Sequence, residues 1–482
     1  MRIDSTVDAS RNNYQQARLR HWNDVARKLE TWTGWGGYYH RRLTQVYQSL
    51  VPPGQSVLEL GCGRGDLLAA LKPARGVGVD FSEGMIDAAR RRHPDIRFLH
   101  ADVHTLNLTE PFDVVILSDL VNDLWDVQTV LGNVSQMTAP HSRIIMNVYS
   151  RLWEPALQVA EWLDVARPTL RQNWLTIEDI TSLLRLADSE VIKHWQEVLL
   201  PLPVWLLAGL CNRVLVKFWP FNHFALTNFI VARPQPRLEA PAKPSSVSVI
   251  IPVRNEAGNI AHIFARTPDM GDSTELVFVE GHSRDNTYAV VETAIAEHPE
   301  RRCQLVRQPG VGKADAVRLG FSRASGEMLM VLDGDLTVPP EALPRFYEAL
   351  WSGKGEFING VRLIYPVEKE AMRFLNLCGN KFFSLAFSWL LGQPIKDTLC
   401  GTKVLWKRDY ATIAANRAYF GDFDPFGDFD LIFGAVRLNL KLLDLPVRYR
   451  ARTYGTTNIQ RWRHGWLLLK MVMMAARRIK FV

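Results

Sequence analysis

The stretch Val57-Leu58-Glu59-Leu60-Gly61-Cys62-Gly63-Arg64-Gly65 joins a short apolar run to glycines at every second position. The apolar run predicts a buried strand. The glycines predict a tight turn at which a ligand can approach the backbone closely. The next predicted strand, Gly76–Asp80, ends in the carboxylate of Asp80, which can accept hydrogen bonds from ribose hydroxyls.

Outward from this stretch, short apolar runs alternate with helical segments through both halves of the chain. Five strands are expected in the first half, at residues 57–60, 76–80, 96–101, 112–118 and 143–148. Four more are expected in the second half, at residues 246–252, 275–279, 304–306 and 328–332. This alternation predicts an α/β protein, with a parallel, doubly wound sheet in the first half.

The length and composition of the chain limit the number of domains and the classes of protein that it can form. The chain has 482 residues, of which 47% are hydrophobic and 22% charged. These values predict two to four globular domains and exclude wholesale disorder and a collagen-like fibre. The five cysteines are scattered without C-x-x-C pairs, which argues against a disulfide framework or a zinc site and favours a reducing cytosol.

A proline-rich stretch divides the chain near residue 240. Residues 234–245 contain four prolines among small and charged residues, a composition typical of an extended linker. We therefore expect a first domain at residues 1–233, the linker at 234–245, a second domain at 246–460 and a basic amphipathic helix at 461–482. The apolar stretch Val198–Asn212 is too short to span a bilayer and predicts a buried helix, with membrane contact as the alternative.

The glycine turn, Asp80 and a further acid at Asp102 resemble the class I S-adenosylmethionine-dependent methyltransferases over about residues 20–233. The resemblance implies a Rossmann-like fold. It also implies that the cofactor contacts the glycine turn with its methionine part, Asp80 with its ribose, and Asp102 and Val103 with its adenine. A dinucleotide-binding oxidoreductase is the alternative, and the glycine spacing and the third acid disfavour it. The implied cofactor-binding residues are Glu59, Gly61, Gly63, Gly65, Asp80, Asp102, Val103 and Asp119.

The segment after the fourth predicted strand, Ser118-Asp119-Leu120-Val121, lacks the Pro-Pro-aromatic pattern of methyltransferases that act on amino groups. An oxygen acceptor is therefore favoured. Methyl transfer to a hydroxyl needs a base to remove the proton. The candidates for this base are Asp119, Asp123, His40 and His141.

Polar side chains also follow the predicted strands of the second half. Pro252, Asn255 and Glu256 follow the first of these strands, and Glu280 ends the second. Lys313 lies in a glycine-containing loop that suits a diphosphate. Asp333-Gly334-Asp335 ends an apolar strand with two carboxylates, which can hold a divalent cation.

This ordered set resembles the inverting family 2 glycosyltransferases of the GT-A fold, and among them the polyprenyl- and dolichyl-phosphate sugar transferases, over about residues 246–465. The resemblance implies a nucleotide-sugar donor, a Mg²⁺ or Mn²⁺ ion on Asp333 and Asp335, and a glycan or polyprenyl-phosphate acceptor. The implied donor-binding residues are Pro252, Asn255, Glu256, Glu280, Lys313 and Asp333. The sequence departs from the family at Glu280-Gly281, where two aspartates are common, and at Thr457-Asn458, where the phosphate-lipid branch usually has Ser-Lys.

The acceptor side is expected further along the chain. Asp397 begins a segment that resembles the family's Asp-x-x-x-Gly-x-Arg/Lys pattern, and Asp428 stands at its late acidic motif. Asp428 is the candidate base, and Asp397 and Arg452 are also predicted to be catalytic. Arg362 and Arg373 are the predicted acceptor-binding cations, which would matter most for a phosphate acceptor.

Two stretches favour contact with a membrane surface. Phe374–Leu391 is apolar with scattered polar residues, and residues 461–482 carry six basic residues and no acid. Most of the formal net charge of +7 therefore lies in the tail, which favours an anionic membrane over nucleic acid as a partner. A terminal helix docked on the core is the alternative for the tail. The N-terminus lacks a signal peptide, so we expect a cytoplasmic protein, peripheral on the membrane.

These observations predict a bifunctional enzyme that transfers a sugar and methylates a hydroxyl in the same pathway. The alternative is a glycosyltransferase whose first domain is a non-catalytic cofactor-binding or docking module.

Overall fold

The computed structural model describes residues 2–29, 36–155, 170, 172–236, 244–362, 374–419, 427–450, 452, 454 and 461–482. The chain divides into two compact units, which are Met1–Gln235 with Phe481–Val482 and Pro236–Lys480. The division falls within the proline-rich stretch, most of which lies outside the described residues. The finer domain limits given above remain predictions.

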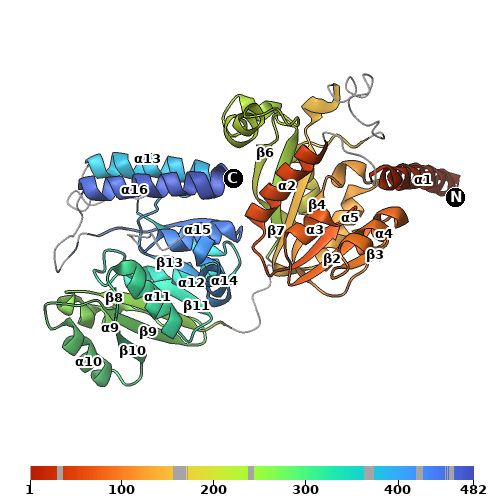
Figure 1. Cartoon of the computed structure of the whole chain (residues 1–482). Helices are drawn as coiled ribbons and strands as arrows, with labels where there is room; N and C mark the ends of the chain where they lie inside the picture. The colour runs from red at the N-terminus through yellow and green to blue at the C-terminus, as the bar shows by residue number, and fades with distance from the viewer. Residues whose placement is uncertain are drawn as a thin grey trace. The chain divides into compact units, whose positions relative to one another are not determined.

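The first unit is built on a seven-stranded sheet in the order β3-β2-β1-β4-β5-β7-β6 (Figure 1). Its strands are β1 (Ser56–Leu60), β2 (Arg75–Asp80), β3 (Arg97–His100), β4 (Phe112–Ser118), β5 (Thr138–Tyr149), β6 (Ser189–Glu197) and β7 (Thr227–Pro234). The five predicted strands pair in parallel, as expected, but β7 is antiparallel to both β5 and β6. The sheet is therefore mixed. The sequence did not predict β6, because most of its residues are only half-buried and show no alternation.

Helices cover both faces of this sheet. They are α2 (Gly36–Leu50), α3 (Asp66–Ala70), α4 (Glu83–Arg92), α5 (Val127–Gln136) and α7 (Ile177–Leu186), and α1 (Arg2–Leu29) packs against α4. Leu58 and Val115 pack in one apolar cluster with α5 and α7, whereas Val57 and Ile116 pack in another with α2 and α4. Because successive strand residues point to opposite faces, these uninterrupted apolar strands supply both clusters.

The expectation of a buried helix at Val198–Asn212 is wrong. After β6 the chain is irregular up to Leu206, and a helical run begins only at residue 207, with the consecutive pieces Leu207–Gly209, Leu210–Val214 and Leu215–Lys217. Trp205 is 86% exposed and Leu206 is 72% exposed. Pro201 and Pro203 lie in this stretch and interrupt the backbone hydrogen bonding that a continuous helix needs.

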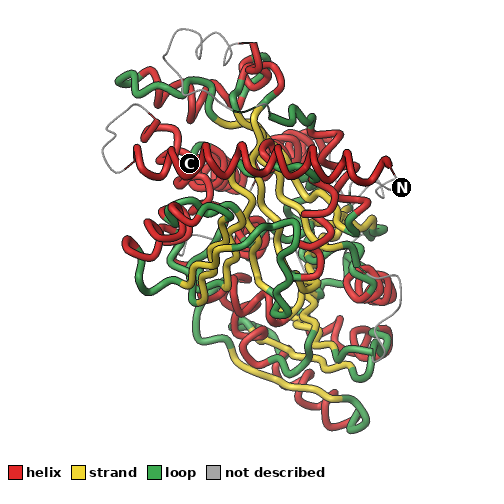
Figure 2. The backbone as a smooth tube through the Cα atoms, turned by 90° about the vertical axis from the view of Figure 1, so that its right-hand side faces the viewer, coloured by secondary structure: helices red, strands yellow, loops and turns green. Residues whose placement is uncertain are grey.

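The second unit has its own seven-stranded sheet, in the order β10-β9-β8-β11-β13-β12-β14. Its strands are β8 (Val247–Val253), β9 (Thr274–Glu280), β10 (Arg302–Arg307), β11 (Met328–Val331), β12 (Phe357–Val361), β13 (Lys403–Trp406) and β14 (Leu442–Pro446). β8 to β11 pair in parallel, and β13 is antiparallel to its neighbours β11 and β12. In Figure 2 the strands of both units are drawn in yellow between red helices.

Two apolar clusters again lie on the two faces. One contains Ile250 and Val331 with α11 (Lys313–Arg323), α13 (Phe374–Leu391), α14 (Lys407–Ala415), α15 (Phe429–Arg437) and α16 (Arg461–Ala475). The other contains Val249 and Met330 with α9 (Ile260–Arg266), α10 (Thr287–Glu297) and α12 (Leu343–Trp351). Both units are therefore three-layered α/β structures.

The basic C-terminal segment forms α16, which is docked on the core of the second unit. Leu468, Met471 and Ala475 are buried, whereas Trp466 and Met473 are exposed. The docked terminal helix, which was the alternative for this tail, is thus present together with an exposed apolar side. Among the described residues, no helix is both long enough and apolar enough to cross a bilayer.

Candidate active sites

The turn after β1 is formed by three glycines with left-handed backbone. Gly61, Gly63 and Gly65 have φ angles of 71°, 51° and 74°, a region that favours glycine. A Cβ atom on Gly65 would lie 2.5 Å from the ring of Phe98, whereas one on Gly63 would meet no atom within 4 Å. The backbone of Gly63 is therefore the part of the turn that is open to a ligand.

Two buried carboxylates lie beside this turn. Asp80 accepts hydrogen bonds from the backbone N–H groups of Gly63 and Ser82, both at 2.9 Å. Burial raises the pKa of Asp80, although these bonds oppose the rise. Burial also raises the pKa of Glu59 to about 8, and its Oε2 atom has no hydrogen-bond partner among the described residues. A buried unpaired oxygen is costly unless a ligand supplies a donor, so these groups fit a ligand with an ammonium group and a ribose.

The third acid of the predicted cofactor site is partnered by the protein itself. Asp102 accepts hydrogen bonds from Gln15 Nε2 at 2.7 Å and from the backbone N–H of His104 at 2.9 Å. Burial acts to raise the pKa of Asp102, but the hydrogen bonds from His104 outweigh it and lower the pKa. Val103 is buried beside it. Since Gln15 belongs to α1, this helix closes the Asp102 side of the site.

Asp119 lies at the end of β4, at the same edge of the sheet as the glycine turn. Its Oδ1 atom accepts hydrogen bonds from the hydroxyl of Tyr39, at 2.8 Å, and from the side-chain amide of Asn147. Burial raises the pKa of Asp119 to about 6, although both hydrogen bonds oppose the rise. A carboxylate with this pKa is suited to accept a proton near neutral pH.

The other three candidate bases are placed less favourably. Asp123 accepts hydrogen bonds from Arg18 Nε at 2.7 Å and from Trp22 Nε1 at 2.8 Å, so α1 engages both of its oxygens. His141 pairs with Asp113 at 3.4 Å, near the amino ends of β5 and β4 and away from the glycine turn. His40 is exposed and lies against the ring of Tyr39.

In the second unit, the pairing of the strands brings the predicted residues to one edge of the sheet. β8, β9 and β11 end at this edge because they are parallel. β13 begins there, since it is antiparallel to β11, and β12 ends there. The loops after β8, β9, β11 and β12 and the first residue of β13, Lys403, are therefore neighbours.

The loops after β8 and β9 are joined by side-chain hydrogen bonds. Asn255 donates its backbone N–H to Ser283 Oγ at 3.0 Å and accepts from the backbone N–H of Arg284 at 2.7 Å. Glu280 ends β9 and caps the same turn by accepting from the backbone N–H of Ser283. Asn255 and Glu280 are thus brought together with Pro252 of β8 at the edge of the sheet where the sequence predicts the nucleotide-binding residues.

Acids and cations alternate across the middle of this edge. Asp333 Oδ1 lies 2.6 Å from Lys313 Nζ, and Asp335 Oδ2 lies 2.6 Å from Arg452 Nη2. Arg452 also reaches Glu256 at 3.5 Å. Burial raises the pKa of Glu256 to about 7; Arg452 opposes this rise. In this structure each aspartate is therefore neutralised by a basic side chain.

The predicted metal ligands form a pair and not a larger cluster. In the described part of the chain, no group of three or more His, Cys, Asp or Glu side chains is arranged to hold a metal ion. Two carboxylates still fit Mg²⁺, which protein sites commonly bind through one or two carboxylates together with substrate phosphates and water. Gly401 leaves room here, since a Cβ atom on it would lie 2.0 Å from Asp333 Oδ2.

The arrangement changes the interpretation of Asp397. Arg362 donates from Nε to Oδ2 of Asp397 at 2.7 Å and from Nη2 to Oδ1 at 2.8 Å. Burial acts to raise the pKa of Asp397, but the Arg362 guanidinium outweighs it and lowers the pKa. A carboxylate held in this way is a poor base, so the geometry assigns Asp397 to positioning Arg362 and not to proton transfer.

Asp428 lies at the start of α15, buried, with Oδ1 3.8 Å from Lys403 Nζ. Lys403 is fully buried and is the last residue of the segment that begins at Asp397, but no role was predicted for it. Tyr39 and Asn147 were missed in the same way. Asn147 could have been found from the sequence, because it is a polar residue within an otherwise apolar strand. Arg373 lies outside the described residues.

Comparison with known proteins agrees with the division of the chain into two units. A sequence profile described as "Methyltransferase domain" matches residues 57–141, and one described as "Glycosyl transferase family 2" matches residues 248–401. The chain joins a methyltransferase domain to a family 2 glycosyltransferase domain. The family and fold expected from the sequence are thereby confirmed.

Similar curated proteins are sugar transferases. The chain is 34% identical over 102 residues to an undecaprenyl-phosphate 4-deoxy-4-formamido-L-arabinose transferase of Shewanella sediminis, covering 20% of this chain and 31% of the relative. It is 35% identical over 109 residues to a dolichol-phosphate mannosyltransferase of Pyrococcus furiosus, covering 22% and 30%. Both matches span less than a third of the relative's length. Glycosyltransferase AglJ of Haloferax volcanii is 27% identical over 227 residues, or 47% of this chain and 70% of that protein.

Similar solved structures include the complex of the Haloferax volcanii Trm112 methyltransferase activator with a methyltransferase, at 19% identity and a TM-score of 0.35, covering 44% of this chain and 97% of that chain. This likeness is too weak to assign an activity.

The pairing of Arg362 with Asp397 predicts a large effect on stability. Asp397→Asn should destabilise the glycosyltransferase domain by about 3 kcal/mol, because Arg362 would remain buried without its counter-charge. Urea denaturation of the full chain measures this loss in the free energy of unfolding. Arg266 and Glu341 form a second two-bonded pair that is more exposed, at 2.8 and 3.0 Å. Glu341→Gln is therefore the control and should cost less than about 1 kcal/mol. Equal losses in the two variants would contradict the structural role of Asp397.

Proposed function

We propose that the chain is a bifunctional transferase. The glycosyltransferase domain moves a sugar from a nucleotide-diphosphate donor to a polyprenyl phosphate or a glycan hydroxyl. The methyltransferase domain moves a methyl group from S-adenosylmethionine to a hydroxyl in the same pathway. The observation that carries the proposal is that each domain gathers its charged side chains at the edge of the sheet where its central parallel strands end. The fusion of the two domains supports successive modification of one product.

In the methyltransferase domain, the open turn at Gly63 and the unpaired oxygen of Glu59 would receive the methionine part of the cofactor. Asp80 would accept hydrogen bonds from the ribose, and Asp102 with Val103 would border the adenine. S-adenosylmethionine supplies an electrophilic methyl group. Asp119 would take the proton from the acceptor hydroxyl as its oxygen attacks, with Tyr39 and Asn147 holding the carboxylate in place.

In the glycosyltransferase domain, Asn255, Glu256 and Glu280 would bind the nucleoside. Lys313 and Arg452, which pair with Asp333 and Asp335 in this structure, would bind the diphosphate. A divalent cation on Asp333 and Asp335 would neutralise charge on the leaving diphosphate. Because the carboxylates already have basic partners, binding the donor with its cation would exchange one set of ion pairs for another.

The acceptor is proposed to be a lipid-borne phosphate or hydroxyl. Asp428, beside Lys403, would act as base for a hydroxyl, whereas Arg362 would attract a phosphate, which needs no strong base. The names of the similar sugar transferases, which refer to undecaprenyl phosphate and dolichol phosphate, support a lipid phosphate as the acceptor. The exposed side chains of Phe382 and Leu385 on α13, together with Trp466 on α16, support peripheral contact of this domain with a membrane.

The test of the bifunctional proposal is incubation of the full chain with isotopically labelled S-adenosylmethionine, a panel of nucleotide sugars and membrane lipid extract. We expect one lipid product that carries both the sugar and the label, identified by mass spectrometry. Sugar transfer with cofactor binding but without label in any product would support the non-catalytic first domain instead.

The pKa of Asp119 predicts the pH dependence of methyl transfer. The carboxylate is the active form, so kcat should rise with pH through about 6 and level off above it. Asp119→Asn should lower kcat by roughly 100-fold or more and remove the inflection. His141→Gln, at the other edge of the sheet, should keep the profile. An unchanged profile in Asp119→Asn would exclude this carboxylate as the base.

Metal dependence tests the aspartate pair. Asp333→Asn and Asp335→Asn should each lower sugar transfer by roughly 100-fold or more and raise the Mg²⁺ or Mn²⁺ concentration needed for half-maximal rate, because each loses one charged ligand. Asp272→Asn changes an exposed aspartate just before β9, at the other edge of the sheet, and serves as control. Full activity of Asp333→Asn in the presence of a chelator would rule out the cation.

A further inference from the structure

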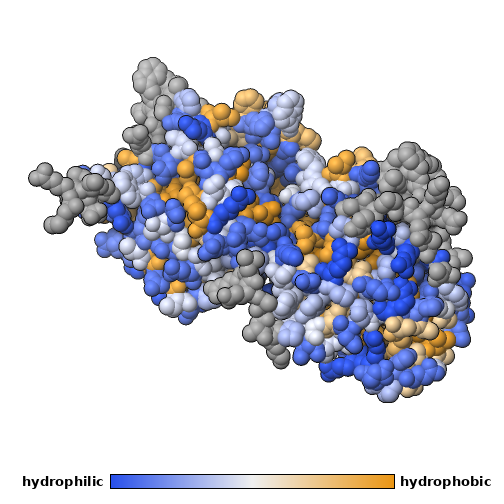
Figure 3. Space-filling view, turned by 180° about the vertical axis from the view of Figure 1, so that it is seen from behind, coloured by the Kyte–Doolittle hydropathy of each residue, from blue (hydrophilic) through white to orange (hydrophobic). Residues whose placement is uncertain are grey.

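The segment between β6 and β7 exposes large apolar side chains on the methyltransferase domain. Trp205 is 86% exposed and Trp219 is 78% exposed. Leu206, Leu210, Phe221 and Phe224 are exposed as well. Figure 1 draws the segment in yellow-green beside β6, and Figure 3 shows hydrophobic surface along the top of this domain. A soluble domain rarely displays so many large apolar groups on one segment, so the segment requires a partner.

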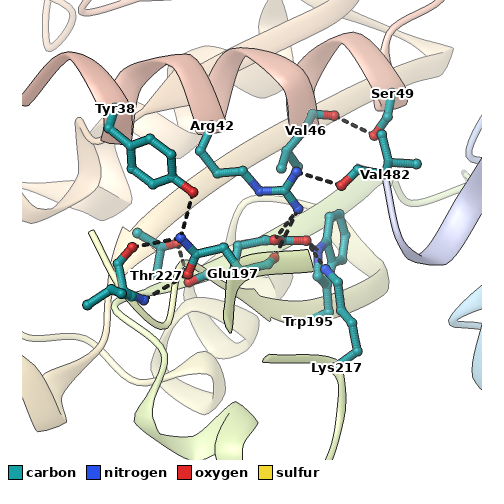
Figure 4. Close-up of polar contacts among 11 residues, drawn as sticks. Tyr38, Arg42, Val46, Ser49, Trp195, Glu197, Lys217, Thr227 and Val482 are labelled. Atoms are coloured by element: carbon teal, nitrogen blue, oxygen red, sulfur yellow. Dashed lines mark hydrogen bonds and ion pairs between the residues drawn. The ribbon is translucent and has the colours of Figure 1, made fainter. Parts of the chain in front are cut away.

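The opposite side of the same segment is firmly held. Asn212 is fully buried, donates to the carbonyl of Leu200 at 2.6 Å and accepts from the backbone N–H of Leu200 at 2.7 Å. Lys217 forms an ion pair with Glu197, and Arg42 Nη2 lies 3.0 Å from the same carboxylate (Figure 4). Buried charges are costly unless they are paired, so this network fixes how the segment folds back on the domain. The exposed side is therefore presented by a defined structure.

The composition of the segment fits a lipid surface. No acidic residue occurs between Glu197 and Thr227, and Arg213 in this stretch is exposed. Tryptophans with leucines and phenylalanines, together with basic residues, are typical of protein surfaces that insert shallowly at the headgroup level of a bilayer.

The segment also begins and ends at the edge of the sheet that carries the cofactor turn. Glu197, the last residue of β6, pairs with Thr227, the first residue of β7, and Thr227 pairs with Tyr149 at the end of β5. The Asn212 side-chain amide donates to the hydroxyl of Tyr38 at 3.1 Å, and the next residue, Tyr39, donates to Asp119. The apolar segment is thus connected to the proposed base through two adjacent tyrosines.

We infer that residues 198–226 dock the methyltransferase domain on a lipid bilayer, so that its methyl acceptor is carried by a membrane lipid. The part that concerns the acceptor rests on the methyl transfer proposed above. Docking would bring the headgroup region to the edge of the sheet where Asp119 lies. The docking residues belong to the methyltransferase domain, whereas α13 and α16 belong to the glycosyltransferase domain.

Vesicle binding by the full chain tests the docking. Vesicles of phosphatidylcholine with phosphatidylglycerol are titrated with the protein, and the bound fraction is measured by flotation. The triple variant Trp205→Ser, Leu206→Ser, Trp219→Ser should bind at least about tenfold more weakly, because three apolar groups no longer enter the bilayer. Leu186→Ser removes a side chain that is 67% exposed at the other edge of the same sheet and should bind like the unchanged protein.

Two further measurements separate the possible outcomes. Calorimetry with S-adenosylmethionine should give the same affinity for the triple variant, which shows that the domain is folded, while label transfer to membrane lipid extract falls. Unchanged vesicle binding in the triple variant would overturn the inference, and a change from dimer to monomer in that variant would assign the surface to self-association instead. Weakened vesicle binding without methylation by the unchanged protein would support docking and overturn the proposed methyl transfer.

Discussion

Parallel strands place all of their carboxyl ends at one edge of a sheet, and both proposed sites depend on this constraint. In the methyltransferase domain it brings the glycine turn after β1, Asp80 after β2 and Asp119 after β4 together. In the glycosyltransferase domain it does the same for Glu256, Glu280 and Asp333. The buried apolar faces fix the register of the strands, so packing energy far from the sites sets the positions of the charged groups.

Antiparallel strands extend this arrangement in each domain. β13 runs against β11, so its first residue, Lys403, arrives at the edge where β11 ends. β7 runs against β5, so the chain between β6 and β7 leaves and re-enters the sheet beside the cofactor turn. A parallel strand in either place would bring these residues to the opposite edge. The mixed sheets therefore add a buried cation to one site and an apolar surface to the other.

The two sites differ in whether their buried carboxylates have basic partners. The glycosyltransferase edge alternates acids with cations, as in Lys313 with Asp333 and Arg362 with Asp397, which keeps the carboxylates ionised. At the methyltransferase edge, Glu59 and Asp119 have no cationic partner among the residues that the structure describes, and burial raises the pKa of each. The first arrangement suits the binding of an anionic diphosphate, and the second suits a cationic cofactor and proton transfer.

The sequence by itself predicted the parallel strands at the centre of both sheets and the two-domain division, because apolar runs and glycine turns are local patterns. Strand-end acids are local patterns too, and their spacing singled out Asp80, Asp333 and Asp335 as candidates without any knowledge of contacts. Only the tertiary structure decided which groups meet. Arg362 engages both oxygens of Asp397, Gln15 reaches Asp102 from a distant helix, and Tyr39 and Asn147 converge on Asp119. The sequence also misjudged Val198–Asn212, because an apolar run has the same composition whether it is buried or exposed, and burial depends on what the rest of the chain packs against it.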